Sequence, residues 1–339
     1  MTDAEYNAAL DALEARIVAD YIKQAQRLRG TITQGEITAM IQAGEIVKIL
    51  RAFDGANYSQ LLEDVRTAYI QGGADAVEEL SRAAQAFVRD ATGARVLGLD
   101  PLRQEAADWI AQNAAGIVRG YSAEQAGAVE AVITSGFSGG LGAPQIARNL
   151  LGVSNPAAGE PFGGVVGLTR QDAEWLGNAR QQLASGDPEQ MRAYLTRTLR
   201  DRRFDGIVQR AIEGGYPVAD GDIDKITQRY AERLLTNRAD IVATVEVNKA
   251  YNAGRQEFYN QILAEGVPAE NIMKRWKTRG DNRVRDQHRA MNGQTVQGSQ
   301  FFTAPDGSQM MNPGDMEHGA PMSQVARCRC RAVYTVVGE

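Results

Sequence analysis

The chain has 339 residues, of which 43% are apolar and 23% charged, with a formal net charge of −5, a composition that suits a globular protein of two or three domains. No apolar run approaches the roughly 20 residues that span a bilayer, so the composition excludes a membrane segment. The acidic start lacks the basic region of a signal peptide, and two cysteines one residue apart make a poor disulfide framework, so we expect synthesis in a reducing cytoplasm.

The first third of the chain shows the period of amphipathic helices. Between residues 4 and 29, apolar side chains recur every three or four positions, and a glycine ends the pattern. Asp100-Pro101 combines an N-cap oxygen with proline at the first helical position, and Ser122 with Gln125 has the spacing of a capping box. A helical N-terminal region is therefore predicted over residues 1–134, with helices at 4–29, 36–53, 59–88, 100–117 and from 122 onward.

The next 130 or so residues continue the helical pattern around one interruption. The segment 151–167 is rich in Gly and Pro and carries one charged residue, which is typical of flexible linkers, although an ordered surface loop fits it equally well. Residues 222–265 predict one or two long helices. We therefore predict a helical middle region over 135–265 with a flexible linker at 151–167.

The pattern changes after residue 265, where short β-leaning pieces alternate with loops. Residues 266–339 are predicted to form a small α+β domain. The predicted fold is mainly α, with multi-helical N-terminal and middle regions followed by this domain. Strands are expected at 274–278, 295–296, 301–302 and 331–337, with a short helix or turn at 285–291.

Charge is divided unevenly along the chain. Residues 271–331 carry ten Lys or Arg against five Asp or Glu, whereas residues 1–270 carry 27 against 36. A basic tip of this kind could contact nucleic acid or an acidic protein surface. The positive charges are too dilute for a recognisable DNA-binding module, and a solvated basic face explains them more simply.

Both histidines and both cysteines of the chain lie in this last segment. Zn²⁺ prefers thiolate and imidazole ligands, so His288, Cys328 and Cys330 are candidate metal ligands, with His318 as a fourth. A small domain with few apolar residues would gain stability from such a metal. A single residue between two cysteines is a tight spacing for one ion, so the alternative is two reduced, partly buried thiols beside a hydrogen-bonded histidine. No other cofactor is expected.

The densest polar cluster of the chain consists of Asp281, Arg283, Arg285 and His288. Asp281 could orient His288 as a general base requires, and a hydrolase or transferase would then use Asp281, Arg285 and His288. No nucleophile, phosphate-binding glycine loop or second carboxylate accompanies them at a useful spacing. A buried salt-bridge network that closes the domain explains the same residues with fewer assumptions, so we predict no catalytic residue.

These C-terminal residues resemble the signature of the phage minor head protein family, the Mu F-like head morphogenesis proteins. The likeness covers roughly residues 135–337. It includes a helix around Glu246 and Asn252 that resembles the glutamate helix of the family. The residues that carry the C-terminal motif are, in chain order, Trp276, Thr278, Asp281, Arg283, Arg285, His288, Gly293, Asp315, Cys328, Arg329 and Cys330.

The resemblance implies a minor capsid protein of a tailed phage that is not an enzyme. Such a protein would be synthesised in the host cytoplasm and lie in the virion, inside the head near the portal, where it assists head assembly and DNA packaging or ejection. Its expected partners are the portal protein and capsid proteins, together with contact to packaged DNA. The alternatives are an enzyme domain that uses the Asp281, Arg285 and His288 cluster, and a basic DNA-contacting module.

Overall fold

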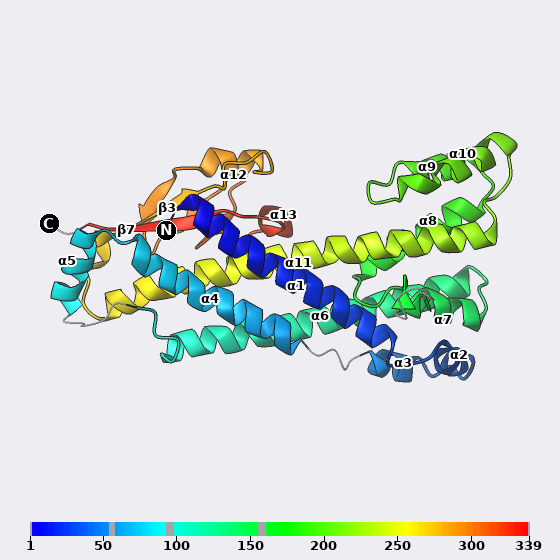
Figure 1. Cartoon of the computed structure of the whole chain (residues 1–339), viewed down its shortest axis with the longest axis horizontal. Coiled ribbons are helices and arrows are strands. Elements are labelled where there is room, and N and C mark those ends of the chain that lie inside the picture. The colour runs from blue at the N-terminus through cyan, green and yellow to red at the C-terminus, as the bar shows by residue number, and fades with distance from the viewer. Residues whose placement is uncertain (1, 54–57, 93–97, 155–160, 338–339) are drawn as a thin grey trace. The chain divides into compact units, whose positions relative to one another are not determined.

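The computed structural model describes residues 2–53, 58–92, 98–154 and 161–337, and its fold is mainly α with a small α+β C-terminal part, as predicted (Figure 1). The helices are α1 (Asp3–Arg29), α2 (Gln34–Gln42), α3 (Ile46–Ala52), α4 (Ser59–Glu79), α5 (Arg82–Thr92), α6 (Gln104–Ser138), α7 (Ala143–Leu151), α8 (Arg170–Ala184), α9 (Pro188–Leu195), α10 (Asp205–Gly214), α11 (Asp220–Ala264), α12 (Asp286–Met291) and α13 (Met322–Val325), with 3₁₀ turns at Arg202–Phe204 and Ala269–Asn271. The strands are β1 (Val153–Ser154), β2 (Pro161–Phe162), β3 (Ile272–Lys277), β4 (Thr295–Gln297), β5 (Phe302–Thr303), β6 (Gln309–Met310) and β7 (Arg331–Val336). Among the described residues, no helix is long and apolar enough to cross a membrane.

The chain divides into two compact units, neither of which is a continuous segment. Unit 1 comprises Met1–Val18, Ser59–Ala115 and Asp240–Glu339, and unit 2 comprises Ala19–Tyr58 and Gly116–Ala239. The long helices α1, α6 and α11 each contribute residues to both units. The boundaries expected at 134/135 and 265/266 do not coincide with this division, because unbroken helices carry the chain from one unit into the other. Whether the segments between the expected boundaries fold on their own stays a prediction.

The C-terminal half of α11 is the central helix of unit 1. Residues 242–248 of this helix are all buried. Because these consecutive residues span almost two helical turns, the helix is enclosed by protein on every side at this point.

Helices α4 and α11 approach each other closely through two glycines, and Figure 1 shows them crossing. A Cβ atom on Gly72 of α4 would lie 2.0 Å from the carbonyl oxygen of Tyr251. A Cβ atom on Gly254 of α11 would lie 1.8 Å from the carbonyl oxygen of Tyr69. Each glycine therefore admits the backbone of the opposite helix, which any larger residue would push away.

A three-stranded antiparallel sheet in the order β4-β3-β7 forms the C-terminal part of unit 1. Along β3, Ile272, Lys274 and Trp276 are buried and alternate with more exposed residues, as in a strand with one face against a core. Strands β5 and β6 pair in a separate hairpin. The strands predicted at 274–278, 295–296, 301–302 and 331–337 correspond to β3, β4, β5 and β7, and the short helix predicted at 285–291 corresponds to α12.

The glycine-rich segment 151–167 is ordered where the structure describes it, in unit 2. Strands β1 and β2 form a short antiparallel pair, and Val165 and Val166, which follow it, are fully buried in the apolar core of the unit. This corrects the expected flexible linker for residues 151–154 and 161–167, because buried valines hold the chain against the core. Residues 155–160 lie outside the described residues.

Helix α6 is longer than predicted. It runs without a break through Ser122, so the helix end near residue 117 and the capping box at Ser122 were wrong predictions. The Gln125 side chain instead donates to the carbonyl oxygen of Phe53 and accepts from the amide of Gly167, both at 3.2 Å. A serine inside a helix costs only a fraction of a kcal/mol, so this buried contact outweighs the local capping signal.

Two other helix boundaries also differ from the predictions. The helix predicted at 36–53 is divided into α2 and α3 at Gly44, whose φ of 70° ends the first of them. The helix predicted to begin at Asp100-Pro101 begins at Gln104, because the Asp100 carboxylate accepts from the Leu102 amide in a turn that precedes it.

Candidate functional site

The C-terminal motif lies within unit 1, and its first part closes one edge of the sheet. The Asn292 side-chain oxygen accepts from the Thr278 amide at 3.0 Å and from its hydroxyl at 3.2 Å. The Gly293 amide donates to the carbonyl oxygen of Trp276 at 2.8 Å, and the φ of Gly293 is 90°. Trp276, Thr278 and Gly293 therefore have a structural role, namely to bring the chain from β3 through α12 back into β4.

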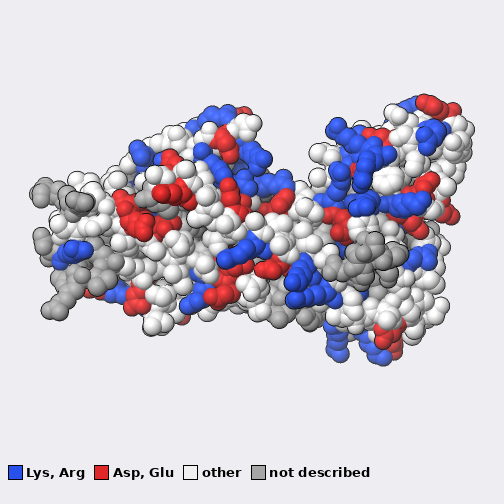
Figure 2. Space-filling view, viewed as in Figure 1, with Lys and Arg blue, Asp and Glu red and all other residues white. Residues whose placement is uncertain are grey.

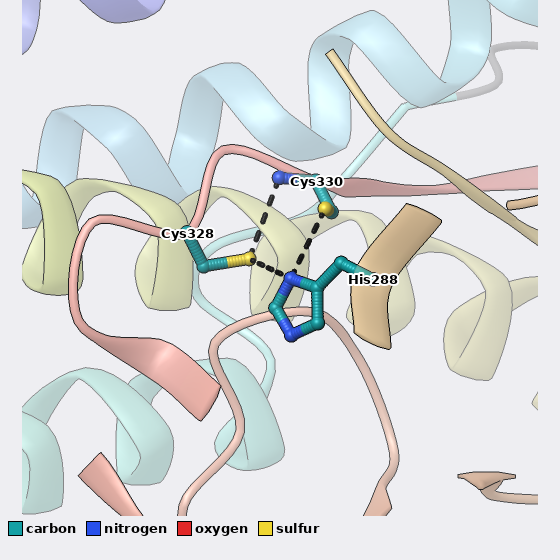
Figure 3. A group of neighbouring side chains, drawn as sticks. All are labelled: His288, Cys328 and Cys330. Atoms are coloured by element: carbon teal, nitrogen blue, oxygen red, sulfur yellow. Dashed lines mark hydrogen bonds between the residues drawn. The ribbon is translucent and has the colours of Figure 1, made fainter. Parts of the chain in front are cut away.

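The second part of the motif brings the predicted metal ligands together. The Nδ1 atom of His288, on α12, lies 3.5 Å from Cys328 Sγ and 3.5 Å from Cys330 Sγ. All three side chains are buried, and their ligand atoms lie within 4.8 Å of one another. Figure 3 shows the imidazole edge turned toward both sulfur atoms, which belong to the loop before β7. The Cys-Arg-Cys segment therefore packs against the histidine.

The other ring nitrogen of His288 has a partner that sequence reasoning missed. His288 Nε2 lies 3.0 Å from Gln324 Oε1, and the Gln324 amide nitrogen donates to Asp306 Oδ2 at 2.6 Å and to Gln287 Oε1. Since a carboxylate accepts hydrogen bonds, this contact assigns the amide oxygen of Gln324 to the histidine. His288 then carries its proton on Nε2, and the lone pair on Nδ1 faces the sulfur atoms.

The two thiols influence each other's ionisation. A hydrogen bond with the Cys330 side chain lowers the pKa of the Cys328 thiol. The same contact with Cys328, together with burial, raises the pKa of the Cys330 thiol. The site as it stands favours one thiolate, because a second negative charge at this distance lacks a compensating cation.

The second histidine lies elsewhere in unit 1. His318 Nδ1 is 2.7 Å from Asp315 Oδ2, its ring packs on Phe301, and its side chain is 42% exposed. Asp315 also accepts from the amide of Met311 at 2.7 Å, which closes the turn. His318 is therefore not a fourth ligand, which corrects that expectation, because its hydrogen bond to Asp315 holds it in a separate loop.

Asp281, which the alternative enzyme reading pairs with His288, has other partners in the structure. Asp281 accepts from the Arg283 amide at 2.9 Å and lies 3.7 Å from the Arg279 guanidinium. Arg285 donates to the carbonyl oxygen of Ala326. The aspartate is thus held by an arginine and by its own turn, and Gln324 orients the histidine in its place.

Basic residues in and around the motif face the N-terminal helix, whose role the sequence did not reveal. Arg279 forms two hydrogen bonds with the Asp11 carboxylate, at 2.8 and 2.6 Å, and Arg329 lies 2.9 Å from Glu14. The bond with Arg279 lowers the pKa of Asp11, whereas burial raises the pKa of Glu14 despite its arginine. Asp3, at the start of α1, pairs with Arg331 and Lys277 at 2.5 and 2.7 Å. In the sequence, only the acidic residues of the first helix indicate these contacts.

A groove of about 1170 Å³ lies between these elements of unit 1. Arginines and carboxylates line most of it, with a few apolar residues of α1 and α11. The polar side chains that line it are Asp11, Glu14, Asp240, Thr244, Arg279, Asp281, Arg283, Arg285, Arg327 and Arg329.

The helix that carries Glu246 and Asn252 packs against the segment that contains the cysteines. Both residues are buried in α11. Asn252 accepts from the Ala332 amide at 3.0 Å and donates to the carbonyl oxygen of Cys330 at 3.3 Å. Arg255, three residues on, donates to the carbonyl oxygen of Ala332 at 2.9 Å. The predicted motif helix therefore binds the backbone at the start of β7 and fixes the position of the second cysteine.

One buried cation of unit 1 belongs to the middle of the sheet. The Lys274 ammonium donates to the carbonyl oxygen of Met311 at 2.7 Å and lies 5.2 Å from the centre of the Phe302 ring. Burial lowers the pKa of Lys274 to about 7, although the Asp315 carboxylate acts in the opposite direction. Sequence reasoning did not single out this lysine, because it stands in a strand among other basic residues.

Comparison with known proteins bears on the same part of the chain. Residues 206–333 match the family model described as phage Mu protein F like protein. The match begins in α10 and ends in β7, so it starts later than the 135–337 expected from the sequence. Searches of curated proteins and of solved structures found no match. Residues 206–333, which contain the whole C-terminal motif, are thus similar to the phage Mu protein F-like family.

Proposed function

We propose that the protein is a minor capsid protein of a tailed phage, located inside the head near the portal. It assists head assembly and DNA packaging or ejection through contacts with the portal protein and capsid proteins. The family match over residues 206–333 is the observation that carries this proposal. The family description itself names only a phage protein, so the portal contact and the role in packaging are the proposed part.

The geometry of the motif favours a structural role over catalysis. Asp281 lies beside Arg279, and both ring nitrogens of His288 face other groups of the protein. Arg279 and Arg329 are engaged by acidic residues of α1. An enzyme that used Asp281, Arg285 and His288 would need these side chains to converge on a substrate. The contacts support a module that holds its own chain together instead.

Contact with packaged DNA is the second part of the proposal, and the groove supports it. Arg283 is exposed and lines the groove together with Arg285 and Arg327. Figure 2 shows that Lys and Arg atoms lie beside Asp and Glu atoms over much of the visible face. Such a mixed surface favours weak contact with the phosphate backbone over a sequence-specific DNA-binding module.

The test begins with particles of the phage that encodes the chain. Mass spectrometry of purified virions is expected to detect the protein at a low copy number relative to the major capsid protein. Heads assembled without the portal protein are expected to lack it. Virions that contain none of the polypeptide would refute the proposal, and portal-free heads that retain it would refute the portal contact.

The DNA contact has its own measurement. The purified chain is expected to bind duplex DNA weakly at low salt, and the affinity should fall as salt rises because counterions are released from the phosphates. Arg283→Gln should reduce the salt dependence of the DNA affinity. Arg192 is an exposed arginine of α9, and Arg192→Gln should serve as the control. An absence of binding at low salt would remove DNA from the proposed partners and leave the head assignment intact.

A further inference from the structure

We propose that His288, Cys328 and Cys330 bind one Zn²⁺ ion, with a fourth coordination position that faces a small pocket. This inference concerns the chemistry of the three side chains and does not depend on the role of the protein in a phage head.

The spacing of the three ligand atoms is the first argument. Tetrahedral Zn²⁺ has Zn–S bonds of about 2.3 Å and Zn–N bonds of about 2.0 Å, so a bound sulfur and nitrogen lie about 3.5 Å apart. Both Cys328 Sγ and Cys330 Sγ are 3.5 Å from His288 Nδ1. The side chains therefore need little or no rearrangement to accept the ion.

The direction of the lone pair is the second argument. Gln324 Oε1 accepts a hydrogen bond from His288 Nε2–H, which leaves Nδ1 unprotonated and directed at two sulfur atoms (Figure 3). An unprotonated nitrogen gains no hydrogen bond from a thiolate, whereas a cation between the three atoms would satisfy all of them. Histidines that bind metals commonly donate their other N–H to a protein oxygen in this way.

The surroundings of the sulfur atoms are the third argument. The Cys330 amide donates to Cys328 Sγ at 3.5 Å, a contact that favours the thiolate form. Two buried thiolates this close to each other need a positive charge between them, which Zn²⁺ would supply. Bound in this way, both cysteines would be ligands in their charged form, as zinc requires.

The fourth position is defined by a cavity next to the cluster. A space of about 20 Å³ is lined by His288, Cys328 and Cys330, with Arg285 and Asp281 among its other walls. That volume is enough for one water molecule. Among the described residues, no further His, Cys, Asp or Glu contributes a ligand atom to this group, so a water molecule is the fourth ligand.

The ion would connect three elements of unit 1. His288 lies on α12, the cysteines precede β7, and Arg329 between them lies 2.9 Å from Glu14 of α1. Since both neighbours of Arg329 would be metal ligands, the ion would hold this arginine in position against α1. Loss of the metal is then expected to loosen the N-terminal helix as well as the cysteine loop.

The experiment uses the full chain, purified under reducing conditions, freed of metal and titrated with ZnCl₂. One equivalent is expected to bind per chain, and Cys328→Ser, Cys330→Ser and His288→Ala should each weaken binding at least about 100-fold. His318→Ala is the matched control, since that histidine is exposed and bonded to Asp315. Titration of the wild-type chain with CoCl₂ should give the absorption bands of cobalt bound to thiolate.

Several outcomes would overturn the inference. Wild-type protein that binds no Zn²⁺, or cysteine variants that bind it as tightly as wild type, would exclude these ligands. Loss of binding in His318→Ala would show that the ligand set is wrong. The cobalt spectrum keeps the test decisive when a variant fails to fold, because a wild-type spectrum without thiolate bands refutes the site without reference to any variant.

Discussion

The side-chain oxygen of Gln324 lies 3.0 Å from His288 Nε2, and this one contact orients the imidazole toward two cysteines. Replacement of the amide by an apolar group should leave the Nε2 proton without an acceptor and allow the ring to turn. Gln324→Leu is therefore expected to lower Zn²⁺ affinity about 10- to 100-fold while all three ligands remain. Competition with a coloured chelator measures the affinity.

Gln300→Leu provides the control for that variant, since Gln300 is an exposed glutamine of the same unit. Its Zn²⁺ affinity should equal that of the wild-type chain. Equal affinity in Gln324→Leu would mean that packing against Trp276, whose ring centre lies 5.2 Å from that of the imidazole, orients the histidine without help from the amide.

The glycines where α4 meets α11 allow a prediction about stability. Gly254→Ala would place a methyl carbon 1.8 Å from the Tyr69 carbonyl oxygen, so the two helices must separate. We expect a loss of more than about 2 kcal/mol in the free energy of unfolding, measured by urea denaturation. Gly116→Ala in α6 is the matched control, because no atom of the described residues beyond its own helix backbone lies within 4 Å of its added carbon.

The control should be slightly more stable than the wild type, by about 0.5–1 kcal/mol, because alanine favours a helix more than glycine does. If both substitutions changed stability by the same amount, the close contact of the two helices would have no energetic importance.

Arg255 offers a test of the buried charges behind the cysteine loop. Its guanidinium is fully buried and bonded to Glu79, and Arg331 lies 3.5 Å from the same carboxylate. Arg255→Met leaves the charge of Glu79 only partly compensated, so the free energy of unfolding should fall by about 3–5 kcal/mol. Arg66→Met, which removes an exposed pair with Glu63, should change stability by less than about 1 kcal/mol.

The double variant Arg255→Met with Glu79→Gln separates the two causes of that loss. It removes the stranded carboxylate, so it should be more stable than Arg255→Met alone. A double variant that is as unstable as the sum of the single changes would contradict the argument from uncompensated charge and would leave lost packing as the cause.

Local patterns predicted much of the architecture. The alternation around Trp276 identified β3, and the scarcity of His and Cys identified the cluster of His288, Cys328 and Cys330. The first signal depends on residues that are near one another in sequence, and the second on residue types that are rare in the chain. Both can therefore be recognised without knowledge of the tertiary structure.

Contacts between distant segments could not be predicted in this way. Nothing marks Gln324 among the glutamines of the chain, and its contact with His288 depends on where α13 packs. The pair of Arg329 with Glu14 joins residues more than 300 positions apart. Sequence spacing allowed Asp281 to orient His288, whereas in the structure its carboxylate lies 3.7 Å from the Arg279 guanidinium, which carries the opposite charge.

Lys274 makes a prediction about pH. Its pKa is about 7 in the folded protein, against an ordinary value of 10.5 when exposed, so the unfolded chain binds more protons between these values. Stability therefore rises as pH increases from about 7 toward 10.5, with a slope of the order of 1 kcal/mol per pH unit from this group. Below pH 7 the lysine is protonated in both states, so the folded protein must bury a charged ammonium. The stability that is gained at higher pH is then absent.

Lys274→Met isolates this contribution, because methionine keeps the buried apolar stem and has no charge. The free energy of unfolding of the variant minus that of the wild type should be largest near pH 6 and should fall steadily as pH rises toward 10. Urea denaturation of both proteins at a series of pH values measures this difference. A difference that stays constant with pH would mean that Lys274 keeps an ordinary pKa in the folded chain, and that its contact with the Met311 carbonyl oxygen offsets the cost of burial.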